Sequence, residues 1–136
     1  MVDRAQRALS EANTIAVVGL SRDPSKAAHA VPASLQAAGF RIIPVHPLAD
    51  QLLGEKVYRS LTDIPDRVDL VDVFRPAREA PGIAEQAVAI GAKTLWLQQG
   101  IVSPEARRIA MDAGLTYVED RCAAVVRAKG RITKHS

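Results

Sequence analysis

Short apolar runs alternate with longer mixed segments along most of the chain. We interpret the runs as strands of a parallel sheet, because strands buried on both faces read as continuous hydrophobic stretches. They lie at residues 14–18, 41–45, 69–74, 93–97 and 116–118. A turn followed by a short extended piece is predicted over 54–58.

The segments between the strands carry helical patterns and helix stop signals. Helices are predicted over 3–12, 27–38, 77–90, 103–113 and 123–129, with a single turn over 60–65 capped by Ser60. Ser103 followed by Pro104 is typical of a helix start. Three helices are expected to end at glycines, namely Gly39, Gly91 and Gly114. Pro32 is disfavoured inside a helix, so the second helix is predicted to begin near Val31 or to kink.

Regular alternation of strand and helix indicates the α/β class. We expect one Rossmann-like domain over residues 1–136, with a doubly wound five-stranded parallel sheet and helices on both faces. An N-terminal helix would lie within 1–12 and a basic tail over 127–136. Counting the strands along the chain, the predicted order is 3-2-1-4-5. Ligands of such sheets bind at the carboxyl ends of the strands, beside the first strand.

Composition narrows the class of protein. The chain has 136 residues, of which 24% are charged, and one cysteine. It lacks an apolar run of the ~20 residues that a membrane span needs, and no signal peptide is recognised. A single cysteine forms no internal disulfide, which favours a cytoplasmic location.

The net charge of +3 is unevenly distributed. The first 120 residues carry 13 basic and 15 acidic side chains, whereas five basic and no acidic residues follow Asp120. We therefore expect no nucleic-acid partner for the body of the domain. The tail is interpreted as a solvated end, or else as a segment that reaches a polyphosphate ligand or an acidic protein partner. The sequence is also compatible with a homodimer.

Candidate binding residues begin in the turn after the first strand. Gly19, Leu20, Ser21, Arg22 and Lys26 combine backbone N–H groups, a hydroxyl and two cations where a helix is about to start. Helix N-termini favour anions, so this turn suits a phosphate, although an ordinary turn between strand and helix is the alternative. The turn lacks the second and third glycines of a dinucleotide-binding loop.

The ends of the later strands supply further candidates. Val45, His46 and Pro47 end the second strand without the carboxylate that would bind an NAD ribose, which disfavours NAD. Phe74 and Arg75 end the third strand and suit a purine and a phosphate. Gln98 and Gly100 follow the fourth strand, where amides suit a polar, uncharged portion of a ligand.

Signals of catalysis are weak. The three histidines, His29, His46 and His135, have no metal-ligand spacing, and neither a G-x-S-x-G nor a C-x-x-C motif is present. Asp72 and the nearby Asp69 could form a paired acidic site, but Asp72 is interpreted as a polar residue near a strand end. Cys122 is interpreted as an unreactive buried thiol rather than a catalytic one. Whether the protein is an enzyme stays uncertain, with binding favoured over catalysis.

Taken together, six stretches resemble a known family at family spacing, over roughly residues 13–122. They are Ile15–Ser21, Gly39–Pro47, Leu53–Tyr58, Val68–Arg75, Ala89–Gln98 and Asp120–Cys122. The chain is similar to the single-domain bacterial CoA-binding proteins, which look like the CoA-binding domain of the succinyl-CoA synthetase α subunit. The resemblance implies a Rossmann-like fold that binds the small molecule coenzyme A or an acyl-CoA.

By this resemblance, Gly19, Ser21 and Lys26 would meet the phosphates, and Gln98 would lie nearer the thiol arm. His46 and Pro47 would border the nucleotide, and Phe74 and Arg75 would line its adenosine side. The chain departs from the family pattern at His46, Ala28 and Pro32, after Cys122, and in its tail. The alternatives are an enzyme acting on an acyl-CoA and a binder of another adenine nucleotide such as NAD(P).

Overall fold

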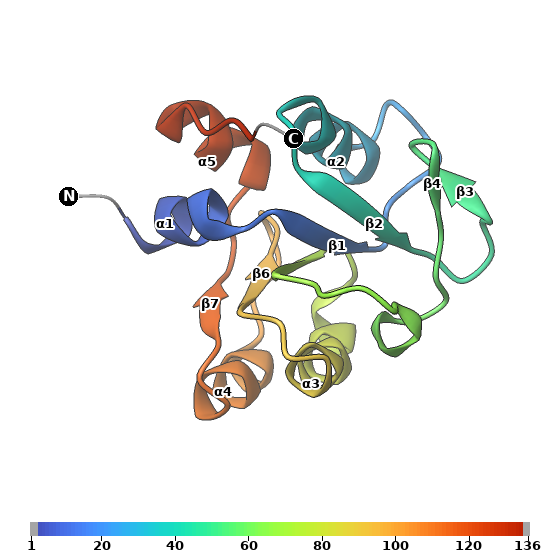
Figure 1. Cartoon of the computed structure of the whole chain (residues 1–136). Coiled ribbons are helices and arrows are strands. Elements are labelled where there is room, and N and C mark those ends of the chain that lie inside the picture. The colour runs from blue at the N-terminus through green and yellow to red at the C-terminus, as the bar shows by residue number, and fades with distance from the viewer. Residues whose placement is uncertain (1–2, 135–136) are drawn as a thin grey trace.

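A five-stranded parallel sheet forms the centre of the computed structural model, which describes residues 3–134 (Figure 1). Its strands are β1 (Thr14–Val18), β2 (Arg41–Val45), β5 (Leu70–Val73), β6 (Thr94–Leu97) and β7 (Thr116–Val118). The sheet order is β2-β1-β5-β6-β7, and every neighbouring pair is parallel. The predicted α/β class and Rossmann-like sheet are confirmed.

The predicted strand order is wrong. Numbered along the chain, the five strands run 2-1-3-4-5 instead of 3-2-1-4-5, so β5 rather than β6 lies beside β1. Pro44 in β2 gives the physical reason, because a proline cannot donate to a sheet ladder and is confined to edge strands. Its carbonyl faces outward and accepts from the Tyr58 N–H. A strand needing an N–H from Pro44 could not pair there, so β2 forms the edge.

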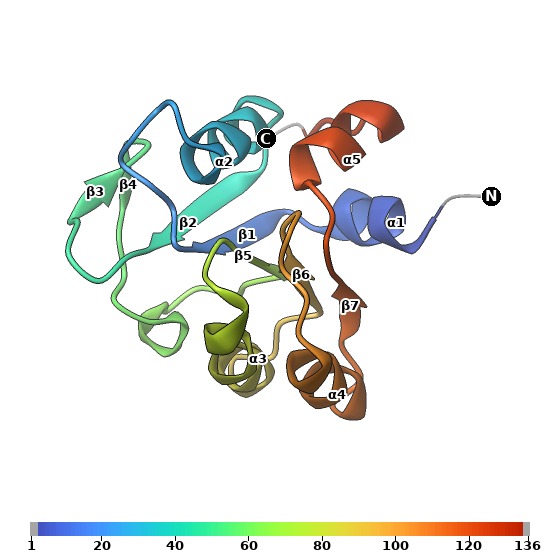
Figure 2. The same cartoon turned by 180° about the vertical axis from the view of Figure 1, so that it is seen from behind.

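Helices cover both faces of the sheet, as predicted (Figures 1 and 2). One face carries α1 (Arg4–Glu11), α2 (Ala27–Ala37) and α5 (Ala123–Gly130), and the other carries α3 (Ala80–Ala89) and α4 (Pro104–Asp112). Two apolar clusters fill these layers, one around Leu9, Leu35 and Trp96 and one around Val71 and Leu97. Each face therefore has its own core.

Smaller elements join these layers. A hairpin of β3 (Gln51–Leu52) and β4 (Glu55–Lys56) follows β2, and two short 3₁₀ helices, η1 (Leu61–Asp63) and η2 (Ala77–Glu79), precede β5 and α3. The Ser103 hydroxyl accepts from the Ala106 N–H, which confirms the predicted cap of α4. Ser60 precedes η1, but its side chain caps no backbone N–H.

Helix α2 spans Ala27–Ala37, which confirms the predicted range of 27–38. It does not begin near Val31, and Pro32 lies inside it.

The basic C-terminal segment is packed against the fold as far as Lys134. The Lys134 N–H donates to the Ala38 carbonyl at 2.7 Å, and its ammonium donates to the Ser10 carbonyl and lies over the Phe40 ring. Gly39 permits this contact, since a Cβ there would lie 1.9 Å from the Lys134 carbonyl oxygen. This position is at the amino end of β2, so the segment up to Lys134 does not approach the carboxyl ends of the strands. His135 lies outside the described residues.

None of the helices described between residues 3 and 134 is long and apolar enough to cross a membrane.

Asp72 is the exceptional residue of the core. It lies in β5 between Val17 of β1 and Trp96 of β6, with 0% of its surface exposed. Neither carboxyl oxygen has a hydrogen-bond partner among the described residues. Burial raises the pKa of this carboxyl well above its ordinary value, because a charge without a partner is strongly disfavoured in an apolar core. Burial therefore favours the protonated form of Asp72 in the folded protein.

We predict that Asp72→Asn increases the free energy of unfolding, and increasingly so as the pH rises above about 4, the ordinary pKa of an aspartate. The unfolded wild-type chain loses the Asp72 proton there while the folded chain keeps it, so wild-type stability falls with pH. The isosteric amide does not titrate. Urea unfolding of both proteins between pH 4.5 and 8 measures the difference. A difference independent of pH would contradict a protonated Asp72.

Candidate functional site

A cavity of about 940 Å³ opens at the carboxyl ends of β1, β2 and β5. Ten of the twelve predicted site residues line it. They are Gly19, Leu20, Ser21, Arg22, Lys26, Val45, His46, Pro47, Phe74 and Arg75. Because β2 and β5 flank β1 on opposite sides, the three loops that follow these strands converge on one crevice. This is the switch point at which open α/β sheets bind ligands.

Gln98 and Gly100 do not line this cavity. The Gln98 side chain is buried, and its Oε1 accepts from the Ala123 N–H at 2.9 Å. The Gly100 N–H donates to the Asp120 carboxylate at 2.7 Å. Their expected place beside β1 depended on the wrong strand order, since β5 separates β6 from β1.

Only part of the loop between β1 and α2 is available to an anion. The Gly19 N–H donates to the Val45 carbonyl, and the Ser21 N–H donates to the Ala28 carbonyl. The Ser21 hydroxyl oxygen accepts from the Asp23 N–H. Within residues 3–134 the N–H groups of Leu20 and Arg22 have no acceptor. Leu20 is buried and Arg22 is exposed, so the Arg22 N–H and the free hydrogen of the Ser21 hydroxyl are the groups open to an anion.

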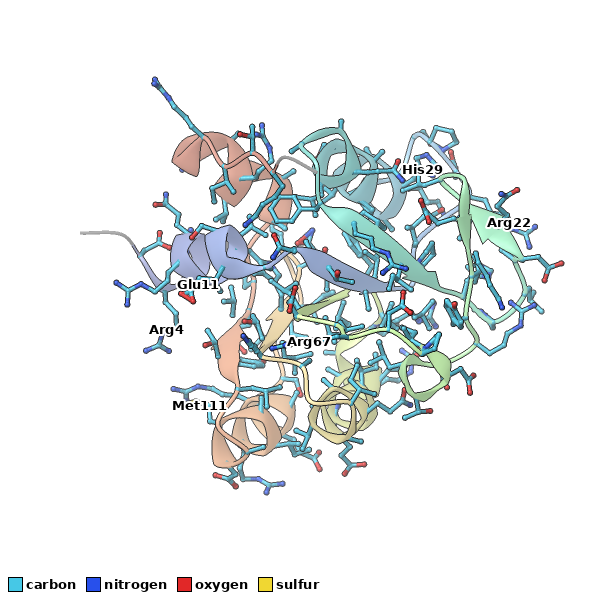
Figure 3. The ribbon with its side chains drawn as sticks, in the orientation of Figure 1. Arg4, Glu11, Arg22, His29, Arg67 and Met111 are labelled. Atoms are coloured by element: carbon cyan, nitrogen blue, oxygen red, sulfur yellow. The ribbon has the colours of Figure 1, made fainter. Side chains whose placement is uncertain are left out.

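Charge around the cavity is predominantly positive. Arg22, Lys26, Arg59 and Arg75 line it together with the carboxylates of Asp23 and Glu79. Both carboxylates already accept hydrogen bonds, Asp23 from Ser25 and Glu79 from Arg75. In the described part of the chain, neither Arg22 nor Lys26 lies within 4 Å of a carboxylate. Figure 3 shows Arg22 on the side of the molecule that carries β3 and β4, away from Arg4 and Glu11.

Arg75 lies directly over Gly19. A Cβ at Gly19 would stand 2.8 Å from Arg75 Cδ and 3.2 Å from the Phe74 carbonyl oxygen. The Arg75 guanidinium is paired with Glu79, with Nη2 2.8 Å from Oε2 and Nε 3.1 Å from Oε1. Gly19 therefore lets the loops after β1 and β5 approach closely, besides adopting a φ of +93°.

His46 holds the loop after β2 as a neutral ring. Its Nδ1 accepts from the N–H groups of Leu48 and Ala49, both at 3.0 Å. A backbone N–H can only donate, so Nδ1 carries no proton and the neutral ring carries it on Nε2. Burial lowers the His46 pKa, and the charges of Arg22, Arg59 and Arg75 lower it further. Protonation of Nδ1 would break both bonds.

Comparison with known families matches residues 13–128 to the CoA binding domain. The chain belongs to this family. The uncharacterized protein YneT of Bacillus subtilis is 41% identical over 120 residues, which cover 88% of this chain and 89% of YneT. The ADP-forming acetate–CoA ligase II of Archaeoglobus fulgidus is 37% identical over 82 residues, which cover 59% of this chain but 12% of the ligase.

Solved structures of other proteins share this fold. A protein from Thermus thermophilus has a TM-score of 0.87 and 38% identity, over 92% of this chain and 95% of its own. A hypothetical protein from Pyrococcus horikoshii has a TM-score of 0.91 and 33% identity, over 95% and 91% of the two chains.

Several residues that line the cavity of this CoA-binding domain escaped the sequence prediction. Glu79, Ile83 and Gln86 line it from η2 and α3, and Arg59 lies beyond the β3–β4 hairpin. The first three are spaced as i, i+4 and i+7, which is the signature of one helix face. That spacing, directly after Arg75, was a usable signal. Arg59 donates to the carbonyls of His46 and Ala49, a contact without a local sequence signal.

The residues considered for catalysis lie outside the cavity. Neither Asp72 nor Cys122 lines it. No group of three metal-ligating side chains occurs among residues 3–134.

We predict that Gly19→Ala destabilises the domain more than Gly100→Ala, which is a matched control. Gly100 has a similar φ of +89°, but a Cβ there meets nothing within 4 Å. Both substitutions force an alanine into left-handed backbone, at about 1–2 kcal/mol, and only Gly19→Ala also displaces Arg75. Thermal and urea unfolding of the two variants measure the difference. Equal losses would show that Arg75 moves aside freely.

We also predict that His46→Asn reduces the loss of stability on acidification. The wild-type His46 pKa is lowered in the folded state, so the unfolded chain takes up the proton first and stability falls below about pH 6.5. An asparagine oxygen can accept from the same N–H groups without titrating. Unfolding free energies at pH 7.5 and 5.5 test this. Parallel losses in both proteins would exclude His46 as the titrating group.

Proposed function

We propose that the cavity binds coenzyme A or an acyl-CoA, and that the domain does so without catalysis of its own. The observation that carries the proposal is the convergence of unpaired cations, free N–H groups and apolar side chains at the switch point of a CoA-binding domain. Phosphates are bound by cations and free N–H groups, and an adenosine ring packs against apolar side chains. We also propose that the protein is located in the cytoplasm.

Each wall of the cavity suits one part of that ligand. In our proposal the Arg22 N–H, the Ser21 hydroxyl and Lys26 bind phosphate oxygens, and Gly19 and Leu20 form the floor beneath them. His46 and Pro47 border the nucleotide from one side, and Phe74 and Arg75 from the other. Gln98 and Gly100 do not line the cavity, and they are not part of this proposal.

Two observations separate this proposal from its alternatives. Residues 46–48, directly after β2, carry no carboxylate for an NAD ribose, and a neutral His46 stands there instead. Ligase activity is not proposed, because this chain matches only 12% of the length of the Archaeoglobus ligase. If the protein turned over acyl-CoAs and Cys122→Ala or Asp72→Asn abolished turnover, the noncatalytic proposal would be wrong.

Thermal-shift and calorimetric titrations with CoA, acetyl-CoA, NAD, NADP and ATP test the ligand class. A ligand at about 100 times its dissociation constant adds about 2.7 kcal/mol of stability. We expect CoA or acetyl-CoA to give the largest shift. Binding of ATP or NAD without binding of CoA would overturn the proposal.

We predict that Lys26→Ala weakens CoA binding about tenfold, or about 1.4 kcal/mol, and weakens binding of dephospho-CoA less. This holds if Lys26 meets the 3′-phosphate, the group that the analogue lacks. Lys93→Ala is the control, because Lys93 precedes β6 at the opposite end of the sheet. Calorimetry of the wild type and the two variants with each ligand measures the six affinities. Equal losses for both ligands would place Lys26 at another part of CoA.

A further inference from the structure

Helix α2 contains a carbonyl that its own helix cannot use. In an α-helix the carbonyl of residue i accepts from the N–H of residue i+4. The partner of the Ala28 carbonyl would be residue 32, but Pro32 has no N–H. The helix nevertheless continues from Ala27 to Ala37. The Ala28 carbonyl is therefore left for a donor from outside the helix.

That donor is the Ser21 N–H in the loop between β1 and α2. It lies 3.1 Å from the Ala28 carbonyl oxygen. The bond joins the middle of the loop to the first turn of the helix that follows it. A residue other than proline at position 32 would offer a second N–H to the same oxygen, and the two donors would compete for it.

The His29 side chain, also in α2, forms a hydrogen bond with the carbonyl group of Ser21. Its Nδ1 lies 2.7 Å from the Ser21 carbonyl oxygen. A carbonyl oxygen can only accept, so the histidine donates and Nδ1 carries the proton. Figure 3 shows His29 at the start of α2, on the side of the molecule that also carries Arg22. The N–H and the carbonyl of Ser21 are thus both bonded to α2.

We infer that Pro32 and His29 are positioning residues for the loop between β1 and α2. This inference rests on the proposed function for its purpose, since the loop would hold the phosphates of CoA. With the Ser21 N–H bonded to α2, the neighbouring Arg22 N–H has no acceptor and stays exposed to the cavity. Neither Pro32 nor His29 lines the cavity, so both act through Ser21.

Hydrogen exchange of the Ser21 amide, measured by NMR without ligand, tests the positioning directly. We expect Pro32→Ala to accelerate this exchange about fivefold, the equivalent of about 1 kcal/mol for one weakened hydrogen bond. CoA affinity should fall by a similar factor, while global stability is kept or raised because alanine favours a helix. Pro104→Ala is the control, since Pro104 opens α4, where no helical N–H bond is lost.

A second set of variants covers the case in which Pro32→Ala does not fold. His29→Leu removes the donor to Ser21 and should reproduce both effects. His29→Gln can restore a side-chain N–H and should rescue them in part. Rescue by glutamine but not by leucine is not expected of a role in packing alone.

The outcomes separate the two proposals. Unchanged Ser21 exchange in both Pro32→Ala and His29→Leu would overturn the positioning role, whatever the protein binds. Faster exchange with unchanged CoA affinity would overturn its link to phosphate binding. If the variants exchange the Ser21 amide faster but the wild-type protein binds no CoA, the positioning of Ser21 by Pro32 and His29 is supported. The proposed function is then refuted.

Discussion

The candidate site depends on one constraint, the pairing of β1 with strands on both of its edges. β2 and β5 hydrogen-bond to opposite sides of β1 in parallel register, and the chain leaves the three strands at the same end. The loops that follow must therefore meet around the end of β1. Gly19 completes the arrangement, because its missing side chain lets Arg75 lie directly over the loop. The order of the strands thus determines where the cavity forms, and the lining residues determine what it can bind.

The sequence was sufficient to predict the five strands of the sheet and the five helices, but not the order of the strands in the sheet. β1, β2 and β7 begin and end as predicted, because each is a continuous apolar run bounded by turn residues. The strand order was predicted wrongly, although Pro44 contained the relevant information about the edge strand. This error placed Gln98 and Gly100 beside β1. An apolar run indicates that a strand is buried, but it does not indicate which strand pairs with it.

The candidate site shows the same division. Residues directly after β1, β2 and β5 were identified, since the ends of parallel strands are where ligands bind. Arg59 was not identified from the sequence, because its hydrogen bonds to the His46 and Ala49 carbonyls, which hold it at the cavity, exist only in the folded chain. The bonding of the Ser21 N–H could not be foreseen either. Pro32 was recognised as unusual, but its consequence for the Ala28 carbonyl required the loop to be in place.

The contact of Lys134 with Ser10 and Ala38 brings the end of the described chain beside its first helix. That helix has eight residues and rises about 1.5 Å per residue, so its start lies roughly 10 Å from Ser10. Segments that lie near one another in a fold can be joined by a linker, as in circular permutation. A linker from residue 134 to residue 3 would allow the chain to be opened instead at the exposed turn around Gly114. Such a rearranged chain would keep every loop around the cavity uninterrupted.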